Sequence, residues 1–288
     1  MANIGKITGT VGSDQTSKDV EIAGVKWSLY RGGFFQFCCA PGYEADVLWS
    51  CTARGKLTVW GVDIERQFEV WSDSFDYMEM DDDKCVYSTS LDFPDTSKEL
   101  NFEADIEVLK IRKIDLSSPT NEAIESPEDA ACLEVEDKKI WVSKKTLSFH
   151  SHFFKTLFSA DFKEKATGSY ALKEVKMVDF QRFLSIIYNL DITIHNEYQD
   201  YLKELLRLGD MWQCDSVLRF CRDMLSCKLI SLDVKIVLSD RYGFFPSLSD
   251  TIKNADLEEL KRLVKEGRLT EISSFAHCLI EKRLLRST

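Results

Sequence analysis

Apolar and β-branched residues that alternate with polar ones dominate the first 116 residues of the chain. Val25, Trp27 and Leu29 are separated by polar positions, which indicates a strand with one buried face. Arg54-Gly55, between two such runs, predicts a tight hairpin. The pattern predicts an all-β antiparallel sandwich over residues 1–116. The runs expected to form strands are Val20–Tyr30, Phe34–Cys39, Asp46–Ala53, Lys56–Val62, Arg66–Ser72 and Phe102–Ile114.

The pattern changes after a polar segment with two prolines, residues 117–128, which predicts a linker. Ala131–Val135 and Lys139–Val142 then predict a strand hairpin, and the apolar period becomes helical. These features predict an α/β domain over 129–226 and a helical extension over 227–288. Further elements are expected as one helix with the stripe Leu147, His150, Phe154, Leu157 and Phe158, a strand at Tyr170–Leu172, and helices over Phe180–Tyr188, Tyr198–Met211, Cys214–Ser226, Leu232–Tyr242, Phe245–Asn254, Asp256–Lys265 and Ser273–Arg286.

Local signals set the expected ends of the last helices. Gly243 and Gly267 predict helix stops, because glycine adopts the left-handed conformation that ends many helices. Ser231 and Asn254 are the expected N-terminal caps.

Composition indicates a globular protein, because 44% of the residues are hydrophobic and only five are proline. No apolar run approaches the ~20 residues that a membrane helix needs, so we expect no membrane partner. The N-terminal segment MANIGKITGT lacks the basic start and apolar core of a secretory signal. The sequence therefore predicts a cytoplasmic or nuclear protein.

The net charge of −11 is unevenly distributed along the chain. Residues 1–128 hold 12 Lys and Arg against 24 Asp and Glu, whereas the remaining residues are nearly balanced. An acidic surface repels phosphate backbones, so no nucleic-acid partner is expected. Two interpretations of the acidic half stay open: it keeps the protein in solution, or it attracts a basic partner.

Candidate chemistry is sparse. The nine cysteines include no C-x-x-C pair, and Cys38 and Cys39 are adjacent, so structural thiols are expected and neither a metal nor a cofactor. His150 and His152 are two residues apart on a predicted helix and point in different directions. The sequence contains no Gly-rich phosphate loop, G-x-S-x-G elbow or H-E-x-x-H motif, so no catalytic residues are expected and the protein is predicted not to be an enzyme.

An ordered series of spacings runs over about a hundred residues of the back half. Its positions are Asp129 before Ala130–Leu133, then Leu147, Ser151, Phe154, Phe158, Phe162, Lys163 and Glu164, then Leu172–Val175, Phe180 through Tyr188, and Leu205–Trp212. Through this series the sequence from Asp129 to Ser226 resembles a BTB (POZ) domain. Where the family often has a histidine beside a lysine, this chain has Ser143 beside Lys144, so the known partner-peptide pockets of transcriptional BTB proteins are not assumed.

The front half resembles a divergent MATH (TRAF-like) domain through two segments, Gly24–Leu29 and Leu48–Ala53. The helices after Ser231 resemble the extension that follows many BTB domains. Together these resemblances place the chain with the MATH–BTB adaptors. They imply a substrate-recognition adaptor that joins a homodimer to a cullin scaffold and holds a protein substrate or peptide for ubiquitin transfer. A structural or transcriptional scaffold without a ligase role is the alternative.

The resemblance also assigns residues to each expected interaction. Cullin binding would use Phe162, Lys163 and Glu164, which occupy the place of a hydrophobic-x-Glu motif; alternatively Phe162 is core and its neighbours form a solvated turn. The residues expected at the dimer interface are Asp129, Leu147, Phe149, His150 and Phe153, some of which must instead be core. The aromatic candidates for substrate binding are Trp49, Trp60, Trp71 and Tyr87, most of which core packing would also explain.

Overall fold

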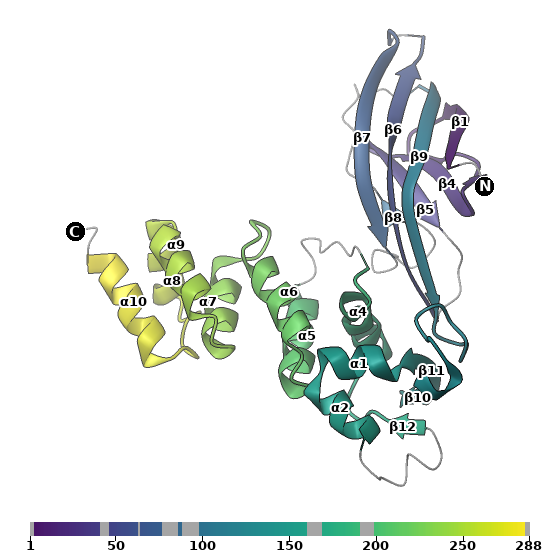
Figure 1. Ribbon diagram of the computed structural model, residues 1–288. Coiled ribbons are helices and arrows are strands. Elements are labelled where there is room, and N and C mark those ends of the chain that lie inside the picture. Colours follow the sequence, from purple (N-terminus) through teal and green to yellow (C-terminus); the bar gives the residue numbers. More distant parts are fainter. Residues whose placement is uncertain are drawn as a thin grey trace. The chain divides into compact units, whose positions relative to one another are not determined.

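The structure is a computed structural model that describes residues 3–40, 46–62, 64–76, 98–159, 169–190 and 199–285, together with the backbone of Val86–Tyr87. The chain divides into two compact units (Figure 1). The first comprises Met1–Ser143 with Tyr188–Thr193, and the second comprises Lys144–Ile187 with Ile194–Thr288.

Two antiparallel sheets make up most of the first unit. In the first sheet the strand order is β1-β9-β6-β7, and Figure 1 shows the long strands β6, β7 and β9 side by side. In the second sheet the order is β2-β4-β5-β8, with β3 paired to β4. The strands are β1 (Ile4–Val11), β2 (Gln15–Thr16), β3 (Val20–Ile22), β4 (Val25–Arg31), β5 (Phe35–Ala40), β6 (Val47–Trp60), β7 (Gln67–Asp76), β8 (Val86–Tyr87) and β9 (Leu100–Asp115).

Both sheets contribute side chains to one hydrophobic core. Trp27 of β4 meets Phe75 of β7 edge to face with ring centroids 5.2 Å apart, and Phe37 of β5 lies 4.3 Å from Trp71 of β7. Because each strand turns alternate residues inward, the predicted alternation of Val25, Trp27 and Leu29 matches their burial. The expectation of an antiparallel β region in the front half is confirmed.

The predicted hairpin at Arg54-Gly55 is wrong. β6 runs without a turn through both residues and pairs with β7 on one side and β9 on the other. Gly55 is needed for a different reason: a Cβ there would overlap the carbonyl oxygen of Asp105 and contact the ring of Trp71 at 3.0 Å. Close approach of neighbouring strands, and not a positive φ, therefore requires glycine at this position.

A tight hairpin lies instead within the run predicted as a single strand, Val20–Tyr30. Ala23 and Gly24 adopt φ angles of 56° and 76°, which join β3 to β4 through a two-residue turn. The residues on either side, Ile22 and Val25, pair with each other across the hairpin.

The predicted hairpin after residue 129 is confirmed as β10 (Ala130–Val135) and β11 (Lys138–Ser143). Glu136 and Asp137 form its turn with φ angles of 48° and 64°. The short 3₁₀ helix η2 (Pro127–Asp129) precedes it. Residues 117–128, predicted as a linker, contain several internal hydrogen bonds and belong to the first compact unit.

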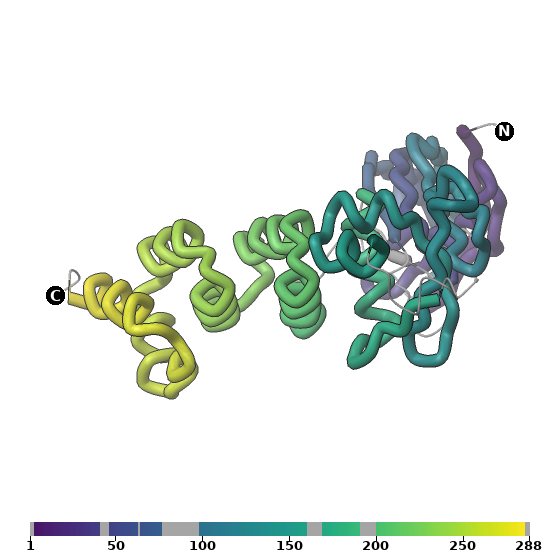
Figure 2. Tube along the Cα trace, turned by 60° about the horizontal axis from the view of Figure 1, so that its bottom comes forward, coloured from purple at the N-terminus to yellow at the C-terminus, as the bar shows by residue number. Residues whose placement is uncertain are grey.

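Helices form most of the second unit, and Figures 1 and 2 show α7 to α10 following one another as short helices. The helix predicted through Leu147 and Phe158 is two helices separated at Ser151. The elements are α1 (Lys144–His150), α2 (His152–Ser159), β12 (Ser169–Ala171), α4 (Met177–Ile187), α5 (Gln199–Met211), α6 (Asp215–Leu225), α7 (Leu232–Arg241), α8 (Phe245–Asn254), α9 (Leu257–Lys265) and α10 (Ser274–Leu285).

The four C-terminal helices follow the predicted boundaries closely and share their own apolar core. Gly243 and Gly267 adopt φ angles of 70° and 67° just after helices, which confirms them as stops. Asp256, and not Asn254, caps α9: its side chain accepts a hydrogen bond from the backbone N–H of Glu259, whereas Asn254 is the last residue of α8.

Candidate functional site

Phe154 attaches helix α2 to the rest of the second unit. It is fully buried, and its ring centroid lies 5.2 Å from that of Trp212 and 6.3 Å from that of Phe183. The hydroxyl of Ser151 donates a buried hydrogen bond of 2.6 Å to the carbonyl oxygen of Trp212, at the point where α1 gives way to α2. This packing holds both helices in a fixed orientation, which in turn fixes the direction of their outward side chains.

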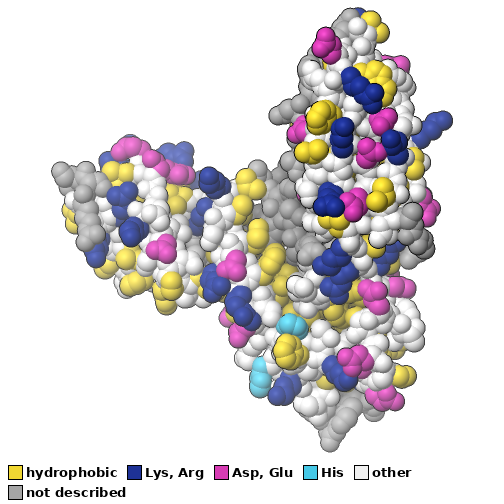
Figure 3. All heavy atoms as spheres, turned by 45° about the horizontal axis from the view of Figure 1, so that its top comes forward, with side chains coloured by type: hydrophobic (Ala, Val, Ile, Leu, Met, Phe, Trp, Pro, Cys, Tyr) yellow, Lys and Arg dark blue, Asp and Glu magenta, His cyan; other side chains and the backbone are white. Residues whose placement is uncertain are grey.

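Two aromatic side chains on the same helices point outward. The side chain of Phe149 is 85% exposed and that of Phe153 is 36% exposed. Phe153 also stacks on Trp212 with centroids 6.2 Å apart, so the packing of the helices determines its position. In the space-filling view of Figure 3, hydrophobic side chains (yellow) lie next to histidine side chains (cyan) on the face that is shown. Aromatic side chains are enriched where proteins contact one another, so Phe149 and Phe153 are candidates for such a contact.

His150 lies beside this exposed aromatic surface. Its Nδ1 is 2.8 Å from the hydroxyl oxygen of Ser216 on α6, and its ring meets that of Phe149 edge to face at 5.0 Å. Partial burial lowers the pKa of His150, and the positive charge of Arg219 lowers it further. The fold therefore favours the neutral imidazole.

This preference predicts a pH dependence of stability. The pKa of His150 is lower in the folded chain than its usual 6.5. The stability that comes from the neutral imidazole is therefore fully present above pH 6.5 and is lost as the pH falls from 6.5 towards the lower pKa of the folded chain. We expect the melting temperature of the wild type to fall more between pH 7.5 and pH 5.5 than that of His150→Gln. Equal decreases in calorimetry would show that His150 does not carry this dependence.

Two of the residues predicted at a dimer interface are buried inside the chain. Leu147 has no exposed surface, and Asp129 is 4% exposed with its carboxylate accepting the backbone N–H of Glu125 at 3.2 Å. Their side chains stabilise their own units, because a buried side chain has no surface left to offer. Phe149 and Phe153 are exposed, and His150 contacts the ring of Phe149 and the hydroxyl of Ser216 on α6.

The aromatic residues predicted to bind substrate do not form one surface. Trp49 and Trp71 belong to the shared core of the two sheets, which removes them from contact with a ligand. Trp60 is partly buried, and the guanidinium of Arg66 lies 5.1 Å from its ring centroid. The side chain of Tyr87 lies outside the described residues, as does the whole predicted cullin segment of Phe162, Lys163 and Glu164.

The most exposed apolar pair on β7 was not among the residues predicted from the sequence. Phe68 and Val70 are 64% and 70% exposed on this edge strand, and the ammonium group of Lys56 lies 4.4 Å from the Phe68 ring centroid. The sequence does contain a signal for a strand here, because Phe68 and Val70 alternate with the polar Gln67 and Glu69. An edge strand with exposed apolar side chains is able to pair with an added strand.

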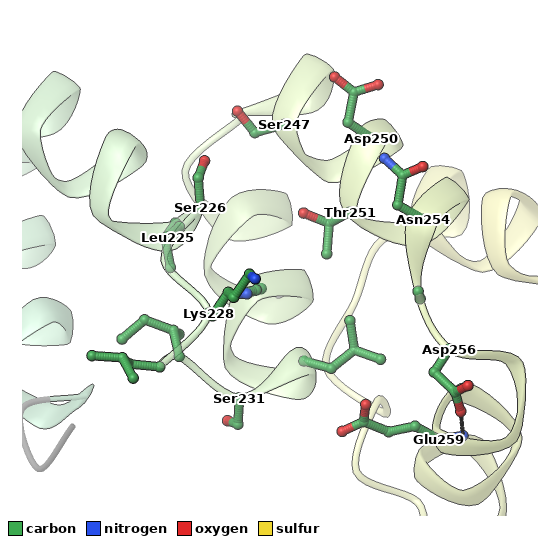
Figure 4. Close-up of a pocket in the computed structure, with 15 residues that line it drawn as sticks. Leu225, Ser226, Lys228, Ser231, Ser247, Asp250, Thr251, Asn254, Asp256 and Glu259 are labelled. Carbon is green, nitrogen blue, oxygen red and sulfur yellow. Dashed lines mark hydrogen bonds between the residues drawn. The ribbon is translucent and has the colours of Figure 1, made fainter.

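A groove of about 560 Å³ lies among α6 to α9 of the second unit (Figure 4). Its lining is mostly polar and includes the cationic Lys228 and Lys235 and the hydroxyls of Ser226 and Ser231. The carboxylates of Asp250, Asp256 and Glu259 also line it, so the groove carries both signs of charge. This arrangement does not favour a single class of ligand.

Thiol chemistry finds little support in the described residues. Burial raises the pKa of the Cys214 and Cys221 thiols, which disfavours their reactive thiolate forms. The described part of the chain contains no group of three or more His, Cys, Asp or Glu side chains placed to hold a metal ion. Nor do the described helices include one with the length and hydropathy needed to span a membrane.

One segment of the chain, which includes α1 and α2, matches a known protein family. Residues 129–229 match the BTB/POZ domain. This region is a BTB/POZ domain. Domains of this kind mediate dimerisation and other protein–protein interactions. The BTB/POZ domain contains the hairpin β10–β11 and the helices from α1 to α6, whereas residues 1–128 lie outside the match.

Two curated relatives, both from Caenorhabditis elegans, are similar to parts of the chain. BTB/POZ domain-containing protein Y57A10B.3 is 28% identical over 158 residues, which cover 54% of this chain and 49% of that protein. BTB and MATH domain-containing protein 45 is 32% identical over 91 residues, which cover 32% of this chain and 19% of that protein. The chain thus spans about half or less of the length of these relatives.

Proposed function

We propose that the protein is a substrate-recognition adaptor of a cullin-RING ubiquitin ligase that works in the cytoplasm or nucleus. In this proposal the BTB/POZ domain dimerises and binds the cullin, while the two-sheet region binds the substrate. Such an adaptor performs no bond chemistry. It contributes by raising the effective concentration of a substrate near the ligase.

The observation that carries the proposal is the outward aromatic surface of the BTB/POZ domain. Phe149 leaves 85% of its surface in solvent, although α1, the helix that bears it, is anchored by the fully buried Leu147. So exposed a side chain adds little to the stability of the single chain, and aromatic residues are enriched where proteins contact one another, which supports a contact with a partner here. A second copy of the chain supplies the same surface, as a two-fold symmetric dimer requires.

A MATH-like role for the front half draws support from two independent observations. A relative bears a name that includes both BTB and MATH domains, although its similarity covers only 32% of this chain. In addition, two antiparallel sheets enclose a single core, and the edge strand β7 exposes Phe68 and Val70. We expect an extended peptide to bind along such an edge, with main-chain hydrogen bonds giving affinity and side-chain contacts giving specificity.

Changing Phe162 and Glu164 to alanine together tests the ligase role. The proposal expects at least about 30-fold weaker binding to a purified cullin, because an apolar anchor and its charged neighbour would both be lost. Titration calorimetry of the full chain measures the affinity, and light scattering checks that the dimer is intact. Lys165→Ala, next in the same segment, is the matched control and should bind as the wild type does.

Unchanged cullin binding by the double variant would contradict the assigned motif. A wild-type chain that dimerises but binds no cullin would instead favour the alternative, a structural or transcriptional interaction scaffold. The test therefore separates the dimerisation part of the proposal from the ligase part.

A further inference from the structure

Arg112, near the end of β9, binds a backbone segment far away in the sequence. Its Nη1 donates hydrogen bonds to the carbonyl oxygens of Tyr188 at 2.7 Å and Asn189 at 2.9 Å. These carbonyls directly follow the last residue of α4, and Asn189 adopts a φ of 52°. The end of a helix carries partial negative charge and unpaired carbonyls, so a guanidinium is well suited to bind there.

The segment that follows β9 is fixed to the hairpin β10–β11. Leu116 is fully buried, and its carbonyl accepts a hydrogen bond of 2.7 Å from the backbone N–H of Trp141 on β11. Asn121 is 6% exposed, and its side-chain amide donates to the carbonyls of Ser118 at 3.0 Å and Trp141 at 3.1 Å. The polar composition that predicted a linker is thus used for specific hydrogen bonds.

Tyr188 completes a closed series of contacts within the first unit. Its buried hydroxyl accepts a hydrogen bond of 3.3 Å from the backbone N–H of Ser143, the last residue of β11. Burial raises the pKa of Tyr188, so the phenol keeps its proton. At the other end, the backbone N–H of Leu116 donates to the carbonyl of Asp46, just before β6. The contacts therefore run from the first sheet through the connector and β11 to Tyr188, and return to the sheet through Arg112.

We propose that Arg112 is a positioning residue that locks the two sheets and the hairpin β10–β11 into one rigid body. The connector, residues 117–128, then acts as a fixed joint and not as a flexible tether. A ligand bound to the sheets would be held at a set orientation to the first strands of the BTB/POZ domain, without the wide search volume of a flexible linker. This inference stands whether or not the protein serves a ligase.

Amide hydrogen exchange on the full chain tests the joint. Arg112→Ala should speed exchange about tenfold to a hundredfold at the amides of Leu116, Trp141 and Ser143, because a charge-assisted hydrogen-bond pair is lost. Amides in the centre of β6 should keep the wild-type rate. Arg54→Ala is the matched control: this arginine lies on the same sheet, but its guanidinium pairs with the exposed Glu107 at 2.7 Å, so its loss should leave the joint unchanged.

A second variant keeps the test decisive if Arg112→Ala does not fold. Arg112→Lys retains the positive charge but has a shorter reach to the two carbonyls, so faster exchange confined to the joint is expected. The proposal is overturned if the wild-type joint exchanges at the rate of an unprotected chain. It is equally overturned if the joint in the folded Arg112 variant exchanges no faster than in Arg54→Ala.

Discussion

Gly55→Ala is expected to destabilise the two-sheet region by about 3 kcal/mol or more. The added Cβ would overlap the carbonyl oxygen of Asp105 on β9 and press on the ring of Trp71 on β7. Because β6 is hydrogen-bonded to strands on both sides at this point, neither neighbour can move away without breaking its own pairing. Urea unfolding followed by tryptophan fluorescence measures the loss, since Trp27 and Trp71 lie in the core.

Gly33→Ala is the matched control for this prediction. A Cβ at Gly33 would meet no atom within 4 Å, so the free energy of unfolding should change by less than about 0.5 kcal/mol. If both variants unfold at the wild-type urea concentration, the close approach of β9 to Gly55 does not exist in solution. A large loss for both variants would point to a general intolerance of the region and not to this contact.

The hairpin predicted at Arg54-Gly55 is wrong because the role of Gly55 depends on a contact with a distant strand, although the local alternation is typical of one continuous strand. The buried positions Cys51, Ala53, Leu57 and Val59 keep one alternation across Arg54-Gly55, which is a signal for an unbroken strand. The Arg-Gly pair is also typical of a turn, and this local signal competes with the alternation. The reason for the glycine is a backbone atom of Asp105, fifty positions away, which no local pattern reveals.

The C-terminal helices were predictable because their signals are local. α8 and α9 each carry an apolar face, and Gly243 and Gly267 end the helices that precede them through their own backbone conformation. The break at Ser151 was not predictable in the same way. The apolar period continues through it, and its side chain bonds to the carbonyl of Trp212, a contact that depends on tertiary packing.

The candidate site was predictable as a group and not residue by residue. Leu147, Phe149 and Phe153 are all apolar residues of one segment that was predicted to be helical, and the family resemblance marked this segment correctly as part of a BTB/POZ domain. Which of them is exposed depends on the position of distant partners such as Trp212, which packs on Phe154 and on one side of Phe153. Burial therefore separates Leu147 from Phe149 only once the helices are assembled.

Phe149→Glu is expected to convert a dimer into a monomer, with the dissociation constant raised about 100-fold or more. The proposed dimer buries this side chain against a second copy, so a carboxylate there would lose its water without gaining a partner. The fold itself should tolerate the change, because Phe149 is 85% exposed within one chain. Val264→Glu, an exposed apolar position on α9, introduces the same charge away from this surface and should leave the dimer intact.

Sedimentation velocity across the micromolar range measures whether each variant is a monomer or a dimer. The melting temperature shows whether either variant has lost its fold. A folded, monomeric Phe149→Glu beside a dimeric Val264→Glu is the expected pair. A wild-type chain that sediments as a monomer, or a Phe149→Glu variant that remains fully dimeric, would contradict the interface.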